Sequence, residues 1–280
     1  IAGAPVIITR TGWTSEIGYE VYLTDSSKGA AVWQALMEAG HPVIDIHLKD
    51  LYELGAEFFR WEIAASVAGH ILGINPFDQP DVELAKKMTT ARLNGVTSAP
   101  PAPPGVKVTQ DGLDIYYTEA TLEMIKGGVP GGGHTASALD GFLKLVKDGD
   151  YIGVLAYYNP ADTAIEGVFN EMRDALREIT GAATQFGFGP RYLHSTGQLH
   201  KGGANKGVFI IFTHATRNDV RIPGSAFSFS ELELSQAFGD MEALASKGRR
   251  VALFNMNDAG AGPLKEAVRL IRKAAGKARS

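Results

Sequence analysis

Two short segments combine lysine, histidine and glycine residues that could act on an oxygen-rich ligand. Residues 73–87 end in two adjacent lysines, and residues 187–207 contain two histidines followed by a lysine and paired glycines. A histidine can give and take a proton near neutral pH, because its free pKa is about 6.5. Glycines let backbone N–H groups approach a phosphate or an oxyanion closely. The candidate site residues of the two segments are Lys86, His194, His200, Lys201, Gly202 and Gly203.

The chemistry that suits these residue types is proton transfer, which a positioned cation or acid assists. The structural alternative is that Lys86 and Lys87 form a solvated helix face and that the glycine-rich segment is a loop with a structural histidine. Two histidines six residues apart are not a metal-binding signature.

Composition places the chain among ordinary globular proteins, with 45% apolar and 21% charged residues. The net charge is −4 and no block of like charges occurs, so no nucleic-acid partner is expected. The only basic cluster, at residues 269–279, is expected to be a solvated helix face. There is no cysteine, which excludes disulfides and thiolate ligands and fits a reducing compartment. No apolar run reaches the ~18 residues of a membrane helix and no signal peptide opens the chain, so we expect a cytoplasmic protein with no membrane contact.

The pattern of apolar residues predicts an α/β fold, with a mostly parallel sheet flanked by helices and a short N-terminal β-hairpin followed by a helix. Continuous apolar strands alternate with amphipathic helices, which is typical of a parallel sheet covered on both faces. Strands are expected at residues 151–157, 207–214 and 249–256, and helices at 56–72, 82–93, 138–147, 162–180, 230–247 and from Pro263 onward. The hairpin is expected within residues 5–24.

Four other segments lead to further structural predictions. Residues 42–48 are a candidate for a short buried strand, and residues 96–104 are proline-rich and indicate a linker. The helix at 56–72 is apolar on two sides, so we expect it to be packed from two sides. Residues 111–118, with a short helix after them, are expected to form a local excursion from the main fold.

The sequence GINPFDQPDVELAK (residues 73–86) resembles the phosphoglucose isomerase pattern GINSFDQxGVELGK. With the preceding EFFRWEIA it is similar to the isomerase domain of bifunctional transaldolase/glucose-6-phosphate isomerases. The family's catalytic lysine falls on Lys86, while Asp81 and Ala85 stand where the usual pattern has glycines. The segment LHSTGQLHKGG also resembles this family, and its isomerase histidine falls on His194. The resemblance runs from about residue 40 to residue 280.

This resemblance implies a sugar-isomerase-like fold and the interconversion of glucose 6-phosphate and fructose 6-phosphate, a reaction of carbohydrate metabolism, with no metal or organic cofactor. It implies that Lys86 and His194 are catalytic and assist the opening of the sugar ring, which moves protons on and off the ring oxygen and the anomeric hydroxyl. It also implies that His200, Lys201, Gly202 and Gly203 contact the substrate. The family takes its carboxylate base and its phosphate site from an upstream segment, and residues 1–40 contain no such segment.

The expected enzyme is therefore incomplete, weakly active or inactive alone, and completed by a missing N-terminal isomerase domain or by a second copy of the chain. Glu57 and Glu62 lie near the lysine segment, but Arg60 is three residues from Glu57, so a helical ion pair is expected rather than a base. A non-catalytic sugar-phosphate-binding fragment and a fragment without activity remain alternatives.

Residues 1–39 carry a different resemblance. The sequence ITRTGWTSEIGYEVYLT resembles the RTGYTGExGYEI segment of aminomethyltransferases, which include the glycine-cleavage T-protein and dimethylsulfoniopropionate demethylases. The resemblance implies a pterin contact for Glu16, with Arg10 nearby, so a folate-binding aminomethyltransferase remnant is a further alternative. Both families tolerate the segment EAGxP at residues 38–42. We hypothesise a chimera joined there, either natural or introduced during sequence assembly, with domains at residues 1–39 and 40–280.

Overall fold

The computed structural model describes residues 1–11, 18–40, 46–94, 101–127, 137–216 and 218–276, without the side chains of residues 8–11, 18–20, 275 and 276. The chain divides into two compact units, residues 1–79 and 80–280. The boundary predicted near residue 40 marks where the two resemblances meet, and it stays a prediction. No helix in these described ranges is long and apolar enough to cross a membrane.

The first unit begins with the expected hairpin and helix. Strands β1 (Val6–Thr11) and β2 (Gly18–Leu23) pair antiparallel, with Val6 opposite Leu23. A 3-10 turn, η1 (Ser26–Lys28), leads into α1 (Gly29–Glu38). Asp25 begins the turn by accepting a hydrogen bond from the Ser27 backbone N–H (3.1 Å), which is the usual work of a residue at a helix start.

Helix α2 (Glu53–Leu72) is longer than expected and less buried. It ends at Gly73, whose left-handed φ of 68° suits glycine. Phe58, Trp61 and Ile71 are 63%, 58% and 76% exposed, so no described element of the first unit encloses these side chains, and the packing from two sides stays a prediction. The spacing of the apolar residues correctly predicted a helix. Burial of those residues also requires a surface to pack against, which the spacing alone does not predict. Glu57 pairs with Arg60, as the spacing predicted.

The short strand expected at residues 42–48 is absent where it can be checked. Residues 41–45 lie outside the described part, while residues 46–48 form no strand and are exposed. The predicted linker at residues 96–104 lies mostly outside the described part as well. Its described residues, 101–104, belong to no helix or strand.

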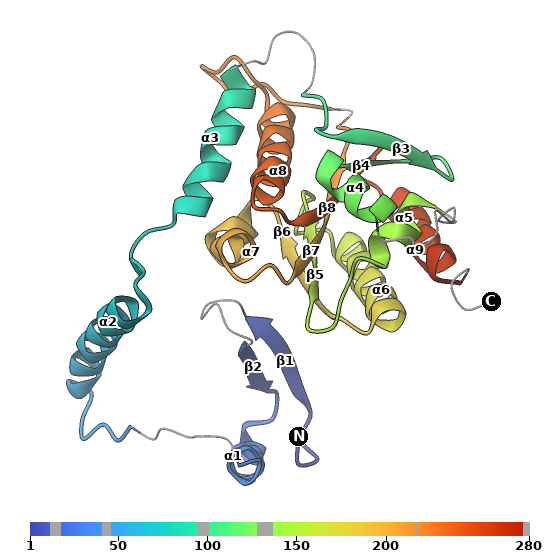
Figure 1. Ribbon diagram of the computed structural model, residues 1–280. Helices are drawn as coiled ribbons and strands as arrows, with labels where there is room; N and C mark the ends of the chain where they lie inside the picture. The colour runs from blue at the N-terminus through green and yellow to red at the C-terminus, as the bar shows by residue number, and fades with distance from the viewer. Residues whose placement is uncertain (12–17, 41–45, 95–100, 128–136, 217, 277–280) are drawn as a thin grey trace. The chain divides into compact units, whose positions relative to one another are not determined.

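The second unit is an α/β fold with a mostly parallel six-stranded sheet (Figure 1). The strands are β3 (Val106–Gln110), β4 (Leu113–Tyr117), β5 (Tyr151–Ala156), β6 (Ala183–Phe188), β7 (Gly207–His214) and β8 (Arg250–Met256). Their order is β3-β4-β8-β7-β5-β6, and β8, β7, β5 and β6 run parallel. This confirms the fold class that the sequence predicted.

Residues 111–118 do not form an excursion, so that expectation was wrong. β3 and β4 form a hairpin, and β4 pairs antiparallel with β8, with Ile115 opposite Phe254. The hairpin therefore extends the main sheet, and its buried Ile115 and Tyr117 belong to the core. α4 (Glu119–Gly127) follows, and then α5 (Ala138–Leu143), which Ser137 caps through its side chain.

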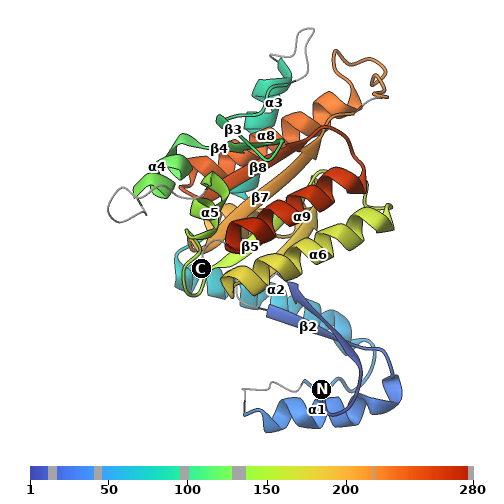
Figure 2. The same ribbon diagram turned by 90° about the vertical axis from the view of Figure 1, so that its right-hand side faces the viewer.

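Helices cover both faces of the sheet. α6 (Thr163–Thr180) and α9 (Ala261–Gly276) lie side by side on one face, where Phe169 and Ile271 join a large apolar cluster (Figure 2). The other face carries α8 (Phe229–Ser246), with Phe238 and Met241 buried against the strands. α3 (Pro80–Asn94) and α7 (Gly197–Gly202) pack on α8 and on each other. The sheet is thus enclosed, as its continuous apolar strands require.

The direction of the connections reverses between β5 and β7. The chain leaves β5 through α6 to the neighbouring β6, whereas it leaves β7 through α8 to β8 on the opposite side. α6 and α8 also cover opposite faces of the sheet. Such a switch point separates the loops that follow the two strands, and open α/β sheets bind ligands in the resulting crevice at the carboxyl ends.

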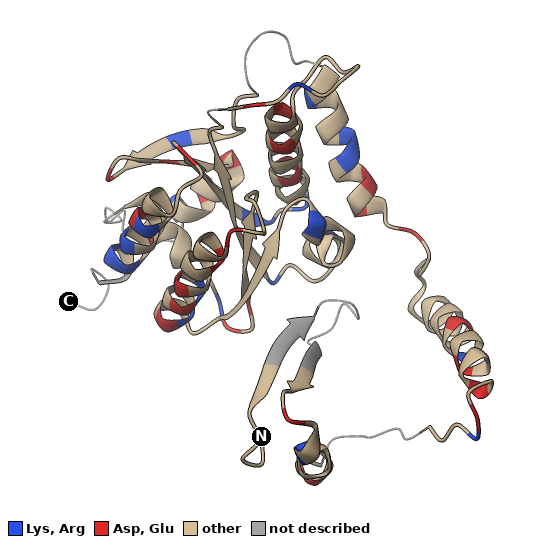
Figure 3. Cartoon of the chain, turned by 180° about the vertical axis from the view of Figure 1, so that it is seen from behind, with Lys and Arg blue, Asp and Glu red and all other residues tan. Residues whose placement is uncertain are grey.

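The helices carry charged residues of both signs, and these residues are not gathered on one face (Figure 3). The described part of the basic C-terminal cluster is exposed and ion-paired: Arg269 with Glu266, Arg272 with Glu178 of α6, and Lys273 with Asp111. These pairs are open to water, and exposed pairs contribute only about 0–1 kcal/mol each. This part of the cluster is therefore a solvated helix face.

A buried arginine forms hydrogen bonds that join the amino ends of three strands, β5, β7 and β8. Arg250, at the start of β8, donates through Nη1 to the Leu145 carbonyl (2.8 Å) and to Asp150 Oδ2 (2.6 Å). Its Nη2 donates to the Asn205 carbonyl (3.2 Å), just before β7. Burial pushes the pKa of Asp150 up, but the hydrogen bonds from Arg250 and the Lys147 backbone outweigh it and hold that pKa below its usual value.

We expect Arg250→Met to lower the free energy of unfolding by about 3–5 kcal/mol, because it leaves the Asp150 carboxylate buried without its partner. Arg272→Met, which removes an exposed pair, should cost less than about 1 kcal/mol. Since the lowered pKa of Asp150 stabilises the fold above the unfolded pKa of about 3.9, the difference between wild type and Arg250→Met should shrink as the pH falls below that value. Urea unfolding at several pH values measures both effects, and equal losses for the two variants would contradict this account.

Candidate functional site

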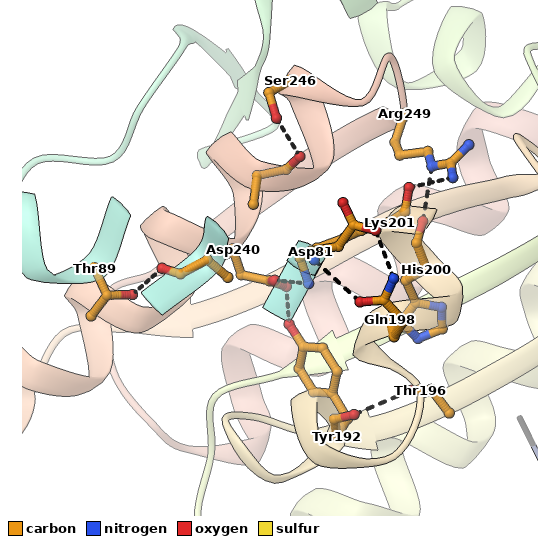
Figure 4. Close-up of polar contacts among 12 residues, drawn as sticks. Asp81, Thr89, Tyr192, Thr196, Gln198, His200, Lys201, Asp240, Ser246 and Arg249 are labelled. Carbon is orange, nitrogen blue, oxygen red and sulfur yellow. Dashed lines mark hydrogen bonds and ion pairs between the residues drawn. The ribbon is translucent and has the colours of Figure 1, made fainter. Parts of the chain in front are cut away.

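The two segments that carry the candidate residues meet where α3 packs on α7 (Figure 4). The Asp81 backbone N–H donates to Gln198 Oε1 (3.2 Å), and Gln198 Nε2 donates back to Asp81 Oδ2 (2.7 Å). Lys247, which follows α8, forms an ion pair with Asp81 Oδ1 (2.6 Å). Asp81 is only 5% exposed, so these bonds join α3, α7 and α8 in a largely dry environment.

The glycines after Lys201 allow this close approach. A Cβ on Gly202 would overlap Asp81 Oδ2 and lie 2.7 Å from Gln198 Nε2. A Cβ on Gly203 would lie 2.6 Å from the Leu199 carbonyl oxygen. Contacts below 3.0 Å are not tolerated without movement. Both glycines were predicted to let the backbone approach a ligand. In the structure, Gly202 instead allows α3 to pack closely, and Gly203 lies close to the preceding turn of α7.

Lys201 lies inside the protein, paired with Asp240 of α8. The side chains of both residues have no exposed surface, and the Lys201 ammonium contacts Asp240 Oδ1. Asp240 also accepts a hydrogen bond from the Tyr192 hydroxyl, which in turn lies 3.4 Å from the Tyr157 hydroxyl. Burial, and then the charge of Asp240, raise the pKa of Tyr192 well above its usual value. The result is a buried polar network with one charge of each sign.

His200 is enclosed as well, with 1% of its surface exposed. Its Nδ1 is 2.9 Å from the Tyr151 hydroxyl, and its ring packs edge-on against Phe209 at 4.9 Å between centroids. Arg249, just before β8, donates to the carbonyls of His200 (2.8 Å), Lys201 (2.6 Å) and Gly203 (2.6 Å). The last carbonyls of a helix have no partner within it, and this guanidinium supplies one for α7.

Lys86 and His194 are the candidate side chains that remain open to solvent. Lys86 lies on the second turn of α3 and forms an exposed ion pair with Glu83 (2.6 Å). His194 ends the 3-10 helix η3 (Arg191–His194), which begins just past the carboxyl end of β6. Both lie on the face of the sheet that α8 covers. Their catalytic roles, and the substrate contacts of His200, Lys201 and the two glycines, stay predictions.

The folate-like residues cannot be judged from the structure. Glu16 lies outside the described residues. Arg10 is on β1 opposite Tyr19, and its side chain is likewise outside the described part. Among the described residues, no three His, Cys, Asp or Glu side chains gather where they could hold a metal ion.

Sequence reasoning missed the residues that hold this junction together. Asp81 was noted only as a departure from the isomerase pattern, and Gln198 and Arg249 carried no signal of their own. The sequence of α8 does indicate one of these contacts, because Asp240 lies between Ala237 and Leu244 on an otherwise apolar, buried helix face. A carboxylate in such a stripe requires a buried cation, because charges are rarely buried unpaired.

The comparisons with known proteins agree with two separate resemblances. A family model described as the GCVT N-terminal domain matches residues 1–47. An aminomethyltransferase of Halothermothrix orenii is 60% identical over 40 residues, which is 14% of this chain and 11% of that protein. The chain therefore contains a short stretch similar to aminomethyltransferases.

Another segment is similar to glucose-6-phosphate isomerases. The enzyme of Leuconostoc mesenteroides is 39% identical over 72 residues, covering 25% of this chain and 16% of that protein. The enzyme of Heliobacterium modesticaldum is 43% identical over 51 residues, covering 18% and 11%. The chain thus spans less than a fifth of the curated relatives named here. The crystal structure of a hypothetical protein from Thermus thermophilus matches with a TM-score of 0.43 and 15% identity, over 49% of this chain and 37% of that one.

We expect Lys201→Met to lower the free energy of unfolding by about 3–5 kcal/mol, because it leaves the Asp240 carboxylate buried without a cation. The double variant Lys201→Met/Asp240→Leu should recover most of that loss, since an apolar pair of similar volume often replaces a buried ion pair without net cost. Denaturant unfolding of the wild type, the single variant and the double variant measures this. A double variant as unstable as the single one would show that the network, rather than the unpaired charge, dominates.

Proposed function

We propose that residues 40–280 form a sugar-phosphate-handling domain of the glucose-6-phosphate isomerase type, related to the isomerase part of bifunctional transaldolase/isomerases. The main support is the junction of α3 and α7. Asp81 and Gln198 come from the two segments that resemble isomerases, are 117 residues apart in the sequence, and bond to each other in both directions. The matches to glucose-6-phosphate isomerases add further support.

The proposed substrates are glucose 6-phosphate and fructose 6-phosphate, and the proposed step is ring opening. In that step the bond between the anomeric carbon and the ring oxygen breaks, the anomeric hydroxyl loses its proton, and the ring oxygen gains one. No electron acceptor is required. His194 would exchange protons near neutral pH, and the Lys86 ammonium would donate to the ring oxygen or stabilise developing negative charge.

Full isomerisation also needs a carboxylate that moves a proton between the first two carbons. Residues 1–40 contain no segment that resembles the family's carboxylate-bearing one. In our proposal this group comes from an N-terminal isomerase domain or from a second copy of the chain. The chain alone would then open the ring but isomerise weakly or not at all.

A second candidate function is supported by the family model that matches residues 1–47. In this proposal Glu16 and Arg10 would contact the pterin of a folate. The matched aminomethyltransferase shares only 11% of its length with this chain, so we propose a binding remnant rather than a methyl-transfer enzyme.

Ring opening can be tested apart from isomerisation by following the exchange of the α and β anomers of glucose 6-phosphate with magnetisation-transfer NMR. We expect the protein to accelerate the exchange, and Lys86→Met or His194→Gln to remove much of the acceleration, since positioned acids and bases contribute ~10²–10⁴-fold. Lys87→Met, on the same helix, and His70→Gln, on the exposed α2, are the matched controls. No acceleration by the wild type, or equal rates in all four variants, would refute the proposed step.

The isomerase reaction itself should be nearly absent in a coupled assay with the chain alone. A turnover near the ~10 s⁻¹ of an ordinary enzyme would contradict the proposal that the catalytic carboxylate is supplied from elsewhere. Glu57 and Glu62 would then be the first residues of the sequence to test.

A further inference from the structure

A cleft of about 740 Å³ opens at the carboxyl edge of the sheet. Its walls come from the segments that follow β5, β6 and β7 and from the start of α8, including Tyr158, Arg191, His214 and Glu233. This is the switch point at which the connections from β5 and β7 diverge. Small-molecule sites in proteins typically occupy about 300–1,000 Å³, so the cleft has the size and the position of such a site.

The walls combine aromatic surface with polar groups. Tyr158 and Phe188 supply rings, and the Tyr158 ring packs edge-on against His214 at 4.6 Å between centroids. Asn159, after β5, and Ser230, in the first turn of α8, add uncharged polar side chains. Ligand pockets commonly have this composition, in which apolar surface gives contact area and a few polar groups set orientation.

The carboxylate of Asp219, in the wall of the cleft, is already hydrogen-bonded within the protein. Asp219 Oδ1 accepts hydrogen bonds from the backbone N–H groups of Val220 (2.8 Å) and Ser230 (3.0 Å), and Oδ2 accepts from the Ser228 hydroxyl. Burial raises the pKa of Asp219, but these hydrogen bonds outweigh it and hold that pKa below its usual value. Asp219 therefore fastens the segment after β7 to the start of α8 and is not available to a ligand.

Three ionisable groups remain for a ligand. Arg191 is exposed, and neither it nor Glu233 forms a hydrogen bond or ion pair with the described residues. His214 Nδ1 lies 3.2 Å from the Ala215 carbonyl, which can only accept, so Nδ1 is assigned as the donor of this hydrogen bond. Burial raises the pKa of Glu233, and the charge of His214 partly opposes that rise. The cleft thus holds, among its described residues, one cation without a partner and one carboxylate in a half-buried position.

We propose that this cleft binds a small phosphorylated sugar, with Arg191 on the phosphate and Glu233 and His214 on hydroxyl groups. A guanidinium bonds a phosphate through two parallel N–H donors. A carboxylate accepts hydrogen bonds from hydroxyl donors. The choice of ligand class rests on the proposed function, whereas the site itself rests on the cleft and its groups.

The same 3-10 helix connects the cleft to the predicted histidine. Arg191 and His194 are the first and last residues of η3. Side chains three residues apart in a 3-10 helix lie on the same side, because the helix has three residues per turn. Among the described residues His194 does not itself line the cleft, so a ligand with its phosphate on Arg191 would reach it only by extending out of the cleft.

Binding is tested by NMR titration of the labelled full chain with three probes: glucose 6-phosphate, inorganic phosphate and glucose. We expect glucose 6-phosphate to bind most tightly and to shift the amides that follow β5, β6 and β7. Arg191→Gln should weaken glucose 6-phosphate and phosphate at least tenfold and leave glucose unchanged. Glu233→Gln should weaken glucose 6-phosphate and glucose but not phosphate. Arg177→Gln and Glu171→Gln, on the exposed side of α6, are the controls and should match the wild type.

The outcomes separate this inference from the proposed function. If Arg191→Gln and Glu233→Gln bind all probes like the wild type, or if none of the probes shifts the amides around the cleft, the inference is overturned, whatever the rate of ring opening. If the cleft binds glucose 6-phosphate as expected while ring opening is absent or insensitive to Lys86 and His194, the site stands and the proposed function fails.

Discussion

The ion pair between Lys201 and Asp240 organises the face of the sheet on which the candidate residues lie. Two charges without exposed surface are tolerated only as partners, so α7 and α8 must be held in one arrangement for both to remain satisfied. Arg249 fixes the end of α7, and Asp81 fixes α3 to α7. The positions of α3 and of η3, which is joined to α7 through Ser195 and Thr196, follow from these bonds.

The junction of α3 and α7 gives a structural reason for one departure from the isomerase pattern. Asp81 stands where that pattern has glycine, and its carboxylate fills the space that Gly202 leaves open. Gln198 and Lys247 satisfy its oxygens, so the added charge is not buried alone. An aspartate on one helix and a glycine on the other are therefore complementary, and a larger residue at position 202 would require Asp81 to move or to be replaced.

Elements that depend on the local sequence were predicted, and features that depend on contacts between distant parts of the sequence were not. The strand at residues 207–214 was predicted to the residue, because a continuous apolar run needs only local information. β6, at the sheet edge and only half-buried, has the mixed sequence ATQFGF and was not predicted. The hairpin of β3 and β4 joined the sheet through β8, whose residues are more than a hundred positions away. The candidate residues were named from local patterns, but whether each was open or enclosed depended on tertiary partners such as Asp240 and Tyr151.

The distance along η3 restricts which ligand could use the cleft and His194 together. Three residues of a 3-10 helix, at about 2.0 Å each, separate Arg191 from His194 by about 6 Å along the axis. A ligand that contacted both would need an anion and a separate oxygen, because the two side chains start about one helical turn apart. A six-carbon sugar phosphorylated on its terminal carbon has its anion at one end and its anomeric centre at the other. Free phosphate lacks the second group and glucose lacks the first, whereas the phosphorylated sugar carries both.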